Sequence, residues 1–261
     1  MRETQVFAGK WALVTGASAG IGAALARELA KCGANLVLTA RRVERLESLA
    51  DELRRLGAEV RVIAADLYEP TGPRLIQEAT RGLAIEILIN NAGLGQYGHF
   101  SECGMEQELS QVRVNCEAVI HLTRLYLPAM LERGRGWVMI VSSLASFQPM
   151  PYLATYAATK AFDRFFAEGL AAEVAGRGIS VAALCPGPTE SEFFQVSRAG
   201  AISGRNRQSA ESVASSGLRA LARGQRVCIP YAAGRLIKLI SWFLPDSLLT
   251  FVLERGTRPG R

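Results

Sequence analysis

Histidine and closely spaced cysteine are scarce in this chain of 261 residues. The sequence has two histidines and five cysteines, and the cysteines lie far apart with no C-x-x-C spacing. Because a zinc site needs Cys or His ligands at short spacings, such a site is nearly excluded and no metal is expected. An odd number of scattered cysteines favours small buried thiols in a reducing cytosol over disulfides, so we expect a cytoplasmic location.

Long hydrophobic runs are also missing. The nearest candidate, 236–253, is interrupted by Lys238, Pro245 and Asp246, so it falls short of the roughly 18 uninterrupted residues of a membrane span. The first residues contain no basic segment followed by an apolar one, so no signal peptide is predicted. Linkers, repeats and low-complexity tracts are absent as well, which favours a single domain.

Acidic residues are few in the last quarter of the chain. Residues 198–261 contain 11 Lys and Arg against 3 Asp and Glu, whereas residues 1–197 contain 19 against 21. Such a basic segment either contacts phosphate, acidic lipid or nucleic acid, or is a solvated surface rich in arginine. No interleaving of basic and aromatic residues supports nucleic-acid recognition, so no nucleic-acid partner is expected.

The sequence does contain a regular alternation of short apolar segments and longer helical ones. Strands are predicted at 11–15, 35–40, 60–66, 86–90, 137–143 and 179–186, with 227–230 as a possible seventh. Helices are predicted at 20–33, 43–56, 73–82, 105–132 and 152–175, the fourth interrupted near its end by Pro128. Strands that are apolar on both faces and alternate with helices indicate a parallel sheet covered on both sides. The predicted fold is an α/β, Rossmann-like, doubly wound sheet of about seven strands. Residues 1–230 would form the body of this domain, and 231–261 an apolar and basic extension of it.

A glycine-rich turn, TGASAGIG at 15–22, follows the first predicted strand. Gly16 permits a tight turn, Gly20 lets backbone N–H groups approach a pyrophosphate, and Gly22 permits close helix packing. The next helix then presents its free N–H groups and positive dipole end to the phosphates. The turn predicts a dinucleotide site that also includes the intervening residues Ser18, Ala19 and Ile21.

The end of the second predicted strand distinguishes between cofactors. NAD sites usually have an acidic residue there, which binds the ribose hydroxyls and repels a 2′-phosphate. Here the sequence is Ala40-Arg41-Arg42, and Arg41 can pair with a phosphate and stack on adenine. We therefore predict NADP(H); the alternative is that both arginines are exposed charges.

Tyr156 and Lys160 are four residues apart in a predicted helix, so their side chains share one face. A lysine ammonium beside a phenol favours phenolate and lowers the tyrosine pKa below about 10. The chain has only four lysines against 26 arginines, which makes a chance surface lysine less plausible here. Ser142 and Ser143 end the fifth predicted strand, at the sheet edge where ligands bind. The pattern predicts a group that donates and accepts a proton, beside a hydroxyl that can hold a carbonyl oxygen.

Together these motifs resemble the short-chain dehydrogenase/reductase family, in its NADP(H)-dependent branch. The similarity runs from about Lys10 to Ser191 and includes TGASAGIG, Asp66, NNAG (90–93), Asn115, Ser143, YAATK (156–160) and PGPTES (186–191). The resemblance implies that Tyr156 is the acid/base, Lys160 binds the nicotinamide ribose and tunes Tyr156, and Ser143 orients the carbonyl. It places Asn115 in the middle of the long helix, anchoring a water that links Lys160 to solvent. The implied cofactor contacts are Asp66, Asn90, Ala92, Gly93, Pro186, Gly187, Thr189 and Ser191.

The implied reaction is direct hydride transfer between the nicotinamide and a carbonyl or alcohol carbon, without a metal. Because NADP(H) pools are usually reduced, we expect reduction of a ketone or aldehyde. The alternative is a nucleotide-sensing regulator with the same fold and little turnover. Loss of Tyr156 or Lys160 would favour this alternative, but both residues are present. The resemblance also implies a homodimer or homotetramer.

Aromatic residues near the predicted site favour an apolar carbonyl or alcohol substrate. Phe193 and Phe194 fall in a predicted lid at 190–210, and Tyr97 and Phe100 in the loop 94–101. The alternative is that these rings only pack the lid.

Residues 231–255 are unusually apolar. Large apolar side chains recur at helical spacing: Leu236, Leu239, Ile240 and Phe243 before Pro245, and Leu248, Leu249, Val252 and Leu253 after it. Such stripes must be covered by the body of the protein, a second subunit or lipid. We expect protein cover, as a cap on the pocket or a subunit interface, with peripheral membrane contact as the alternative.

Overall fold

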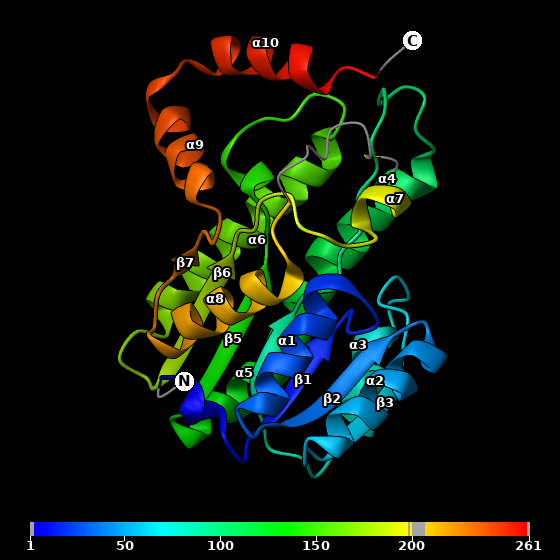
Figure 1. The fold of residues 1–261 in the computed structure, drawn as a ribbon, viewed down its shortest axis with the longest axis vertical. Coiled ribbons are helices and arrows are strands. Elements are labelled where there is room, and N and C mark those ends of the chain that lie inside the picture. Colours follow the sequence, from blue (N-terminus) through cyan, green and yellow to red (C-terminus); the bar gives the residue numbers. More distant parts are fainter. Residues whose placement is uncertain (1–2, 198, 200–206, 260–261) are drawn as a thin grey trace.

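Seven parallel strands form one sheet at the centre of the structure (Figure 1). The computed structural model describes residues 3–197, 199 and 207–259. The strands are β1 (Trp11–Thr15), β2 (Asn35–Ala40), β3 (Val60–Ala64), β4 (Ile85–Asn90), β5 (Gly136–Val141), β6 (Ile179–Leu184) and β7 (Val227–Cys228). They lie in the order β3-β2-β1-β4-β5-β6-β7, so the order reverses between β1 and β4. In such sheets ligands bind at the carboxyl ends of the strands, next to the reversal.

Helices cover both faces of the sheet, and each face has its own apolar core. One core is shared with α1 (Gly20–Lys31), α2 (Val43–Arg55) and α8 (Ala210–Ala222), the other with α3 (Gly72–Ala79), α5 (Ala118–Arg133) and α6 (Ala154–Glu173). Successive residues of β1 divide between them: Ala12 and Val14 lie in the first core and Leu13 in the second. This alternation explains why the strands are apolar throughout, and the predicted doubly wound α/β fold is confirmed.

The helix predicted at 105–132 consists of three segments. They are α4 (Met105–Val112), a π-helical turn at Arg113–Glu117 and α5. The prediction that Pro128 interrupts the helix was wrong, because α5 continues to Arg133. A proline removes one backbone donor, and the buried residues Tyr126 and Met130 on either side keep α5 packed on the sheet. The irregular turn lies instead at Asn115, and such turns frequently occur at functional sites.

The chain after β6 differs most from the sequence-based expectation. It forms α7 (Phe193–Val196), the unpredicted α8, the short strand β7, and the helices α9 (Ala232–Phe243) and α10 (Asp246–Thr257). Ser209 caps α8 by accepting a hydrogen bond from Ser212 N at 3.2 Å. The strand predicted at 227–230 is two residues long, and Pro230 has no N–H to extend the ladder. The predicted break at Pro245 is confirmed: α9 and α10 form an arch at the top of Figure 1.

Candidate active site

The glycine-rich turn connects β1 to α1 at the carboxyl edge of the sheet. Gly16 and Gly20 have φ values of +64° and +54°, which glycine adopts without strain. A Cβ on Gly16 would lie 2.9 Å from Ala92 Cα, and one on Gly22 would overlap the Gly16 carbonyl oxygen. Ala19 provides no side-chain cap for α1, so N–H groups of the first turn remain available for a phosphate. The turn, with Ser18, Ala19 and Ile21, lines one cavity and fits a dinucleotide pyrophosphate.

A carboxylate is held beside this turn by two arginines. Arg42 Nη1 lies 2.7 Å from Glu192 Oε2, and Arg45 Nη1 lies 2.5 Å from Glu192 Oε1. Arg42 also donates through Nε and Nη2 to Ser18 Oγ, at 3.2 and 3.0 Å. Two guanidinium groups around one anion, next to a hydroxyl, form a set of donors that suits a phosphate. Arg45 and Glu192 were missed from the sequence, and 150 residues separate Arg42 from Glu192.

The predicted adenine contacts also line the cavity. Arg41 Nη1 lies 3.9 Å from Asp66 Oδ2. Asp66 Oδ1 accepts a hydrogen bond from Tyr68 N at 3.0 Å, which orients the carboxylate after β3. Arg41 and Asp66 are therefore close together, as a shared role at the adenosine end requires.

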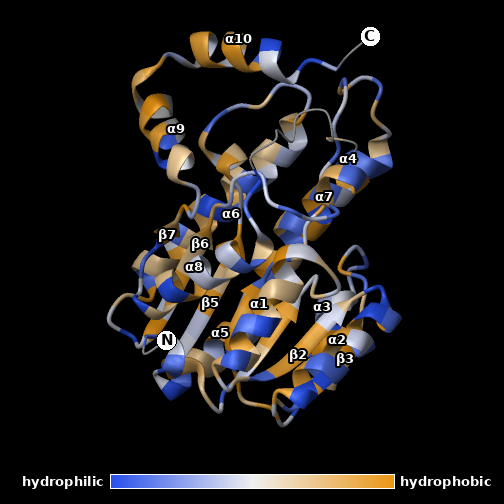
Figure 2. Cartoon of the chain, in the orientation of Figure 1, coloured by the Kyte–Doolittle hydropathy of each residue, from blue (hydrophilic) through white to orange (hydrophobic). Residues whose placement is uncertain are grey.

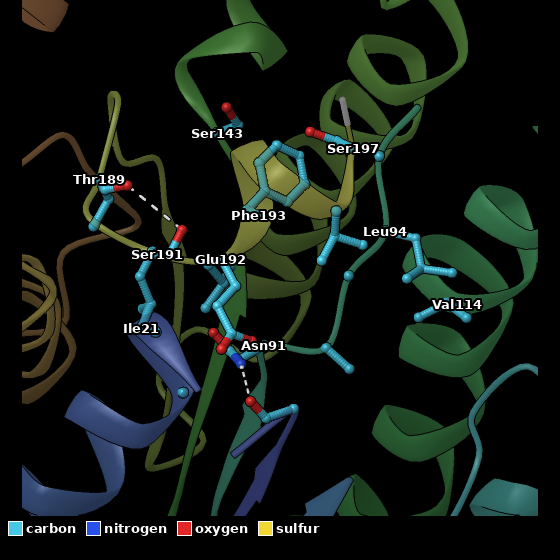
Figure 3. Close-up of a pocket in the computed structure, with 18 of the residues that line it drawn as sticks. Ile21, Asn91, Leu94, Val114, Ser143, Thr189, Ser191, Glu192, Phe193 and Ser197 are labelled. Carbon is cyan, nitrogen blue, oxygen red and sulfur yellow. Dashed lines mark hydrogen bonds between the residues drawn. The ribbon is translucent and has the colours of Figure 1, made fainter. Parts of the chain in front are cut away.

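Asn90 does not lie where it was predicted. Its buried side chain donates to Thr123 Oγ1 on α5 at 3.0 Å, and it does not line the cavity. The neighbouring Asn91 lines the cavity instead (Figure 3). Its Nδ2 donates to the Thr15 carbonyl oxygen at 2.8 Å and to the Gly16 carbonyl oxygen at 3.3 Å. Successive residues at a strand end point to opposite sides, so only one of the two asparagines can face the ligand. Ala92 and Gly93 line the cavity as expected.

The segment after β6 lines the predicted nicotinamide end of the cavity, through Pro186, Gly187, Thr189 and Ser191. The Thr189 hydroxyl donates to the Gly187 carbonyl oxygen at 2.9 Å, and Ser191 Oγ donates to the Thr189 carbonyl oxygen at 3.5 Å (Figure 3). A Cβ on Gly187 would lie 2.9 Å from the Tyr231 ring. These contacts hold the backbone in a defined path along the cavity.

Ser143, Tyr156 and Lys160 line the same cavity. Ser143 follows β5 and accepts a hydrogen bond from Ala145 N at 3.1 Å. Tyr156 and Lys160 lie on one face of α6, as their spacing predicts. The Phe193 ring of α7 lies 5.1 Å from the Tyr156 ring, measured between centroids. The fold therefore brings the three predicted groups together at the carboxyl edge of the sheet.

Lys160 is paired with a buried carboxylate that sequence reasoning missed. Its Nζ donates to Asp163 Oδ2 and to the Val141 carbonyl oxygen, both at 2.8 Å. Burial raises the pKa of Asp163 to about 6, although Lys160 opposes the shift. Burial alone would lower the pKa of Lys160, but Asp163 and Tyr156 raise it above its usual value. Lys160 is therefore held as an ammonium.

The protonation of Tyr156 differs from the sequence-based expectation. Burial raises the pKa of the phenol above its usual value, although Lys160 and Ser143 both lower it. The prediction that Lys160 brings the phenol below its usual pKa was wrong for this structure. Desolvation outweighs the ammonium, and the charge of Asp163 further opposes it. At neutral pH the phenol is protonated and can act as a proton donor.

Asn115 is fully buried in the π-helical turn. Its Nδ2 donates to the Leu94 carbonyl oxygen and to Thr159 Oγ1, both at 2.9 Å, and its Oδ1 accepts from Leu94 N at 2.8 Å. A Cβ on Gly93 would lie 3.5 Å from Asn115 Oδ1 and 3.4 Å from Lys160 Nζ, so both groups border Gly93. Asn115 thus fixes the loop after β4 beside Lys160; its role in anchoring a water stays a prediction.

The cavity has a volume of about 550 Å³, and its lining beyond Tyr156 is mostly apolar, with Gln148 and Ser197 as polar members. Its apolar lining there comprises Leu94, Val114, Leu144, Met150, Leu153, Phe193, Phe194, Val196 and Ala199. Figure 3 shows the Phe193 ring between Ser143 and Leu94. Residues 198 and 200–206 of the predicted lid lie outside the described residues, and α7 forms part of the remainder.

Two of the four aromatic residues predicted at the substrate end do not line it. Tyr97 is buried beside the cavity, in a cluster with Leu153 and Ala199, and its hydroxyl donates to the Thr257 carbonyl oxygen of α10 at 2.7 Å. Phe100 is 65% exposed. Only Phe193 and Phe194 contact the cavity, so the prediction for Tyr97 and Phe100 was wrong.

The arch of α9 and α10 is only partly covered by its own chain. Leu249 is buried and Leu253 is half-buried, and Tyr152 Oη donates to Glu254 Oε1 at 2.7 Å. The exposed large apolar side chains of the two helices are Leu236, Leu239, Ile240, Phe243, Leu248, Phe251 and Val252. Figure 2 shows the apolar colouring of both helices. The described chain therefore covers Leu249 and part of Leu253 but leaves most of these stripes exposed; cover by a second subunit or by lipid stays a prediction.

Across the described ranges, no helix combines the length and apolar character needed to cross a membrane. Within the same ranges, no group of three His, Cys, Asp or Glu could hold a metal ion. All five cysteines are free thiols, with Cys185 and Cys228 buried and the other three half-buried.

Comparison with known proteins links these motifs to a family. A family model described as short chain dehydrogenase matches residues 10–201. The chain is 37% identical over 196 residues to very-long-chain 3-oxoacyl-CoA reductase of Anas platyrhynchos, covering 73% of this chain and 63% of that protein. It is 37% identical over 183 residues to 17-beta-hydroxysteroid dehydrogenase type 3 of Mus musculus, covering 68% and 59%. The chain thus spans about three-fifths of the length of these curated relatives.

A solved structure matches over nearly the full length. A short-chain dehydrogenase from Sphingobium yanoikuyae in complex with NADPH has a TM-score of 0.81 and 32% identity, covering 97% of each chain. The NADPH is a ligand of that protein. Its match to this chain also covers the C-terminal region, beyond the residues that the family model matches. The family model, the curated relatives and this structure agree, and the chain belongs to the short-chain dehydrogenase/reductase family of oxidoreductases.

Proposed function

We propose that the protein is an NADP(H)-dependent carbonyl reductase that acts on an apolar ketone or aldehyde. The observation that carries the proposal is a single cavity with a phosphate-binding turn at one end and Ser143, Tyr156 and Lys160 at the other. The cofactor, when bound, supplies the hydride. The Tyr156 phenol donates its proton to the carbonyl oxygen, which the Ser143 hydroxyl holds in place. Lys160 binds the nicotinamide ribose, and Asn115 fixes the neighbouring loop.

The proposed cofactor is NADP(H) because the adenosine end of the cavity is basic. Arg41, Arg42 and Arg45 follow β2, and no acidic residue stands where an NAD site usually has one. Arg42 and Arg45 bind an anion beside Ser18, as their pairs with the Glu192 carboxylate show, and a 2′-phosphate would take the place of that carboxylate. The remaining proposed contacts are Gly16, Ala19, Gly20, Ile21, Gly22, Asp66, Asn91, Ala92, Gly93, Pro186, Gly187, Thr189 and Ser191.

The proposed substrate is a ketone or aldehyde on a large apolar body. The apolar lining from Leu94 to Phe194 can enclose such a body but offers few hydrogen bonds to a sugar or an acid. The names of two relatives refer to a 3-oxoacyl-CoA and to a hydroxysteroid. Both contain a ketone or secondary alcohol on a long or bulky apolar skeleton, which supports the same substrate class here.

The proposed setting is a cytoplasmic homodimer or homotetramer. The free, scattered cysteines support a reducing compartment. The uncovered apolar stripes of α9 and α10 support a subunit interface, with a peripheral membrane contact as the alternative.

A screen of carbonyl compounds tests the proposal. Aliphatic and steroidal ketones, 3-oxoacyl thioesters and aldehydes are incubated with NADPH or NADH, and oxidation of the reduced nicotinamide is followed by its absorbance. We expect apolar ketones or aldehydes to be reduced, faster with NADPH, and Tyr156→Phe to be inactive on the same compounds. If NADPH binds but no compound is reduced, the protein is better described as a nucleotide-binding regulator.

A further inference from the structure

Asp163 is a buried carboxylate next to the catalytic pair. It lies on α6 three residues after Lys160 and seven after Tyr156, so all three side chains share one helix face. Its exposed fraction is 1%, and its Oδ2 lies 2.8 Å from Lys160 Nζ. Its other oxygen, Oδ1, has no hydrogen-bond partner among the described residues. A carboxylate buried this deeply is costly unless it is paired, and such a pair is weak support for stability alone.

The pair removes much of the positive field that Lys160 would exert on Tyr156. A lone ammonium beside a phenol favours phenolate, whereas an ammonium in contact with a carboxylate is nearly neutral at a distance. In this structure the charge of Lys160 lowers the pKa of Tyr156, and the charge of Asp163 raises it. Burial is the main cause of the raised pKa of Tyr156, and the Asp163 carboxylate adds to it by offsetting the charge of Lys160.

The pair also fixes the position of Lys160. An ammonium has three N–H donors, of which two bind Asp163 Oδ2 and the Val141 carbonyl oxygen. One donor is left for a hydroxyl of the ribose. Because β5 and α6 both hold Nζ, its place relative to the Tyr156 phenol is set before a cofactor binds.

Among the described residues, the groups that act on Lys160 besides Asp163 are Tyr156 and Cys116. Cys116 in the π-helical turn interacts electrostatically with both Asp163 and Lys160, but burial raises its pKa to about 12, so it stays a neutral thiol. Glu117 follows it and is exposed to solvent. The neighbouring β5 contributes a backbone carbonyl, and Ser142 donates to the Lys160 carbonyl oxygen at 2.7 Å.

We propose that Asp163 is a positioning residue that anchors Lys160 beside Tyr156 and offsets its charge there, favouring carbonyl reduction over alcohol oxidation. The inference rests on the proposed function and deepens it. In reduction the Tyr156 phenol would give its proton to the carbonyl oxygen while a bound nicotinamide would supply hydride to the carbonyl carbon, and solvent would then return a proton to the phenolate. In oxidation the phenolate must be present first, which a protonated phenol disfavours.

The test compares pH profiles of the wild type and Asp163→Asn, which removes the charge but keeps the shape. The kcat/KM for reduction falls, and that for oxidation rises, as the Tyr156–Lys160 pair loses its first proton. Without the carboxylate that proton should leave more readily. Both limbs of the profiles, the fall in reduction and the rise in oxidation, should therefore move to lower pH by about one unit. The matched control is Glu117→Gln, an exposed carboxylate on the adjacent segment, which should leave both limbs in place.

A second measurement does not depend on turnover. The phenolate absorbance of Tyr156 is titrated as the difference between each protein and its Tyr156→Phe counterpart. We expect ionisation at lower pH in Asp163→Asn than in the wild type. Should Asp163→Asn fail to fold, Asp163→Val removes the carboxylate without leaving polar atoms to satisfy, and the same comparison is made.

The outcomes separate the two proposals. A wild type that reduces no carbonyl compound contradicts the proposed function, and the phenolate titration then still decides the role of Asp163. The inference is overturned if a variant without the Asp163 carboxylate folds and binds NADPH but shows the same pH limbs and the same phenolate titration as the wild type. Asp163 is then only a structural partner of Lys160.

Discussion

The helix α1, which follows the glycine-rich turn, and the C-terminal arch of α9 and α10 both have apolar stripes. Only α1 buries its stripe within the chain. Leu25 and Leu29 of α1 are fully buried against the sheet. In the arch, Leu236 is 58% exposed and Phe243 is 78% exposed. The helix α1 buries its apolar stripe within the chain, whereas the exposed stripes of the arch are of the kind that marks an interaction surface. Substitutions in the catalytic and nucleotide sites should therefore change the catalytic rate and leave the oligomeric state as it is. Changes in the arch should alter stability or the oligomeric state and leave the catalytic residues in place.

The largest expected effect is on Tyr156. Tyr156→Phe should lower kcat by about 10²–10⁴, the contribution of one positioned acid, while NADPH binds within a few-fold of the wild type. The oligomeric state should not change. Steady-state kinetics, NADPH titration and light scattering measure these three quantities. Activity within about tenfold of the wild type would show that another group donates the proton.

Removing the arch should have the next largest effect. Truncation after Pro230 removes α9 and α10 and with them the buried side chain of Leu249, which should cost about 1.5–3 kcal/mol of unfolding free energy, and it removes the bond from Tyr97 to Thr257. We expect a lower melting temperature or a smaller oligomer, measured by calorimetry and light scattering.

The same truncation distinguishes subunit contact from lipid contact. Full-length and truncated protein are sedimented with neutral and with anionic liposomes. If the full-length chain pellets with the anionic vesicles and the truncated one stays soluble, folded and oligomeric, the arch binds membrane and the subunit interface is excluded.

Cofactor preference should depend on the arginines after β2. Arg42→Ala removes the guanidinium that contacts Ser18 and Glu192, so the NADP(H):NAD(H) ratio of kcat/KM should fall by about 1.5–3 kcal/mol, roughly tenfold or more. Arg41→Ala should lower the ratio as well. The matched control is Arg54→Ala, an exposed arginine later in α2. A wild type that prefers NAD(H), or an unchanged ratio in both variants, would show that these arginines are only surface charges.

The smallest expected effect is on the contact between the loop after β4 and the arch. Tyr97→Phe removes a buried hydrogen bond to the Thr257 carbonyl oxygen, which should lower the unfolding free energy by about 0.5–1.5 kcal/mol. Tyr152→Phe is the control, because its bond to Glu254 lies nearer the surface, and its stability should hardly change. Equal losses in the two variants would mean that the buried bond does not anchor the arch.

Local patterns were sufficient to predict the sheet, the glycine turn and the Tyr156–Lys160 pair. Each depends on a short period or spacing: apolar runs for the strands, and four residues along a helix for the pair. The spacing also puts Asp163 on the same helix face, so a search for buried charges along 156–163 would have found it. Its consequence, a protonated phenol, depends on burial, which no spacing reveals.

Contacts between distant segments could not be predicted. Glu192 meets Arg42 across 150 residues, and Tyr97 meets the backbone of Thr257 across 160. Asn90 and Asn91 are chemically identical, and only the direction in which β4 ends decides that Asn91 faces the cavity. Pro128 stays helical because tertiary packing holds α5 in place, against its local preference.

Transfer of deuterium tests the central claim most directly. NADPH deuterated at the transferred position is incubated with the preferred ketone or aldehyde, and the product alcohol is analysed by mass spectrometry and NMR. We predict one deuterium on the carbinol carbon for each NADPH consumed by the wild type, and almost none in the same time with Tyr156→Phe. NADPH that binds but labels no carbonyl compound, or a Tyr156→Phe variant that transfers deuterium at the wild-type rate, would contradict the account.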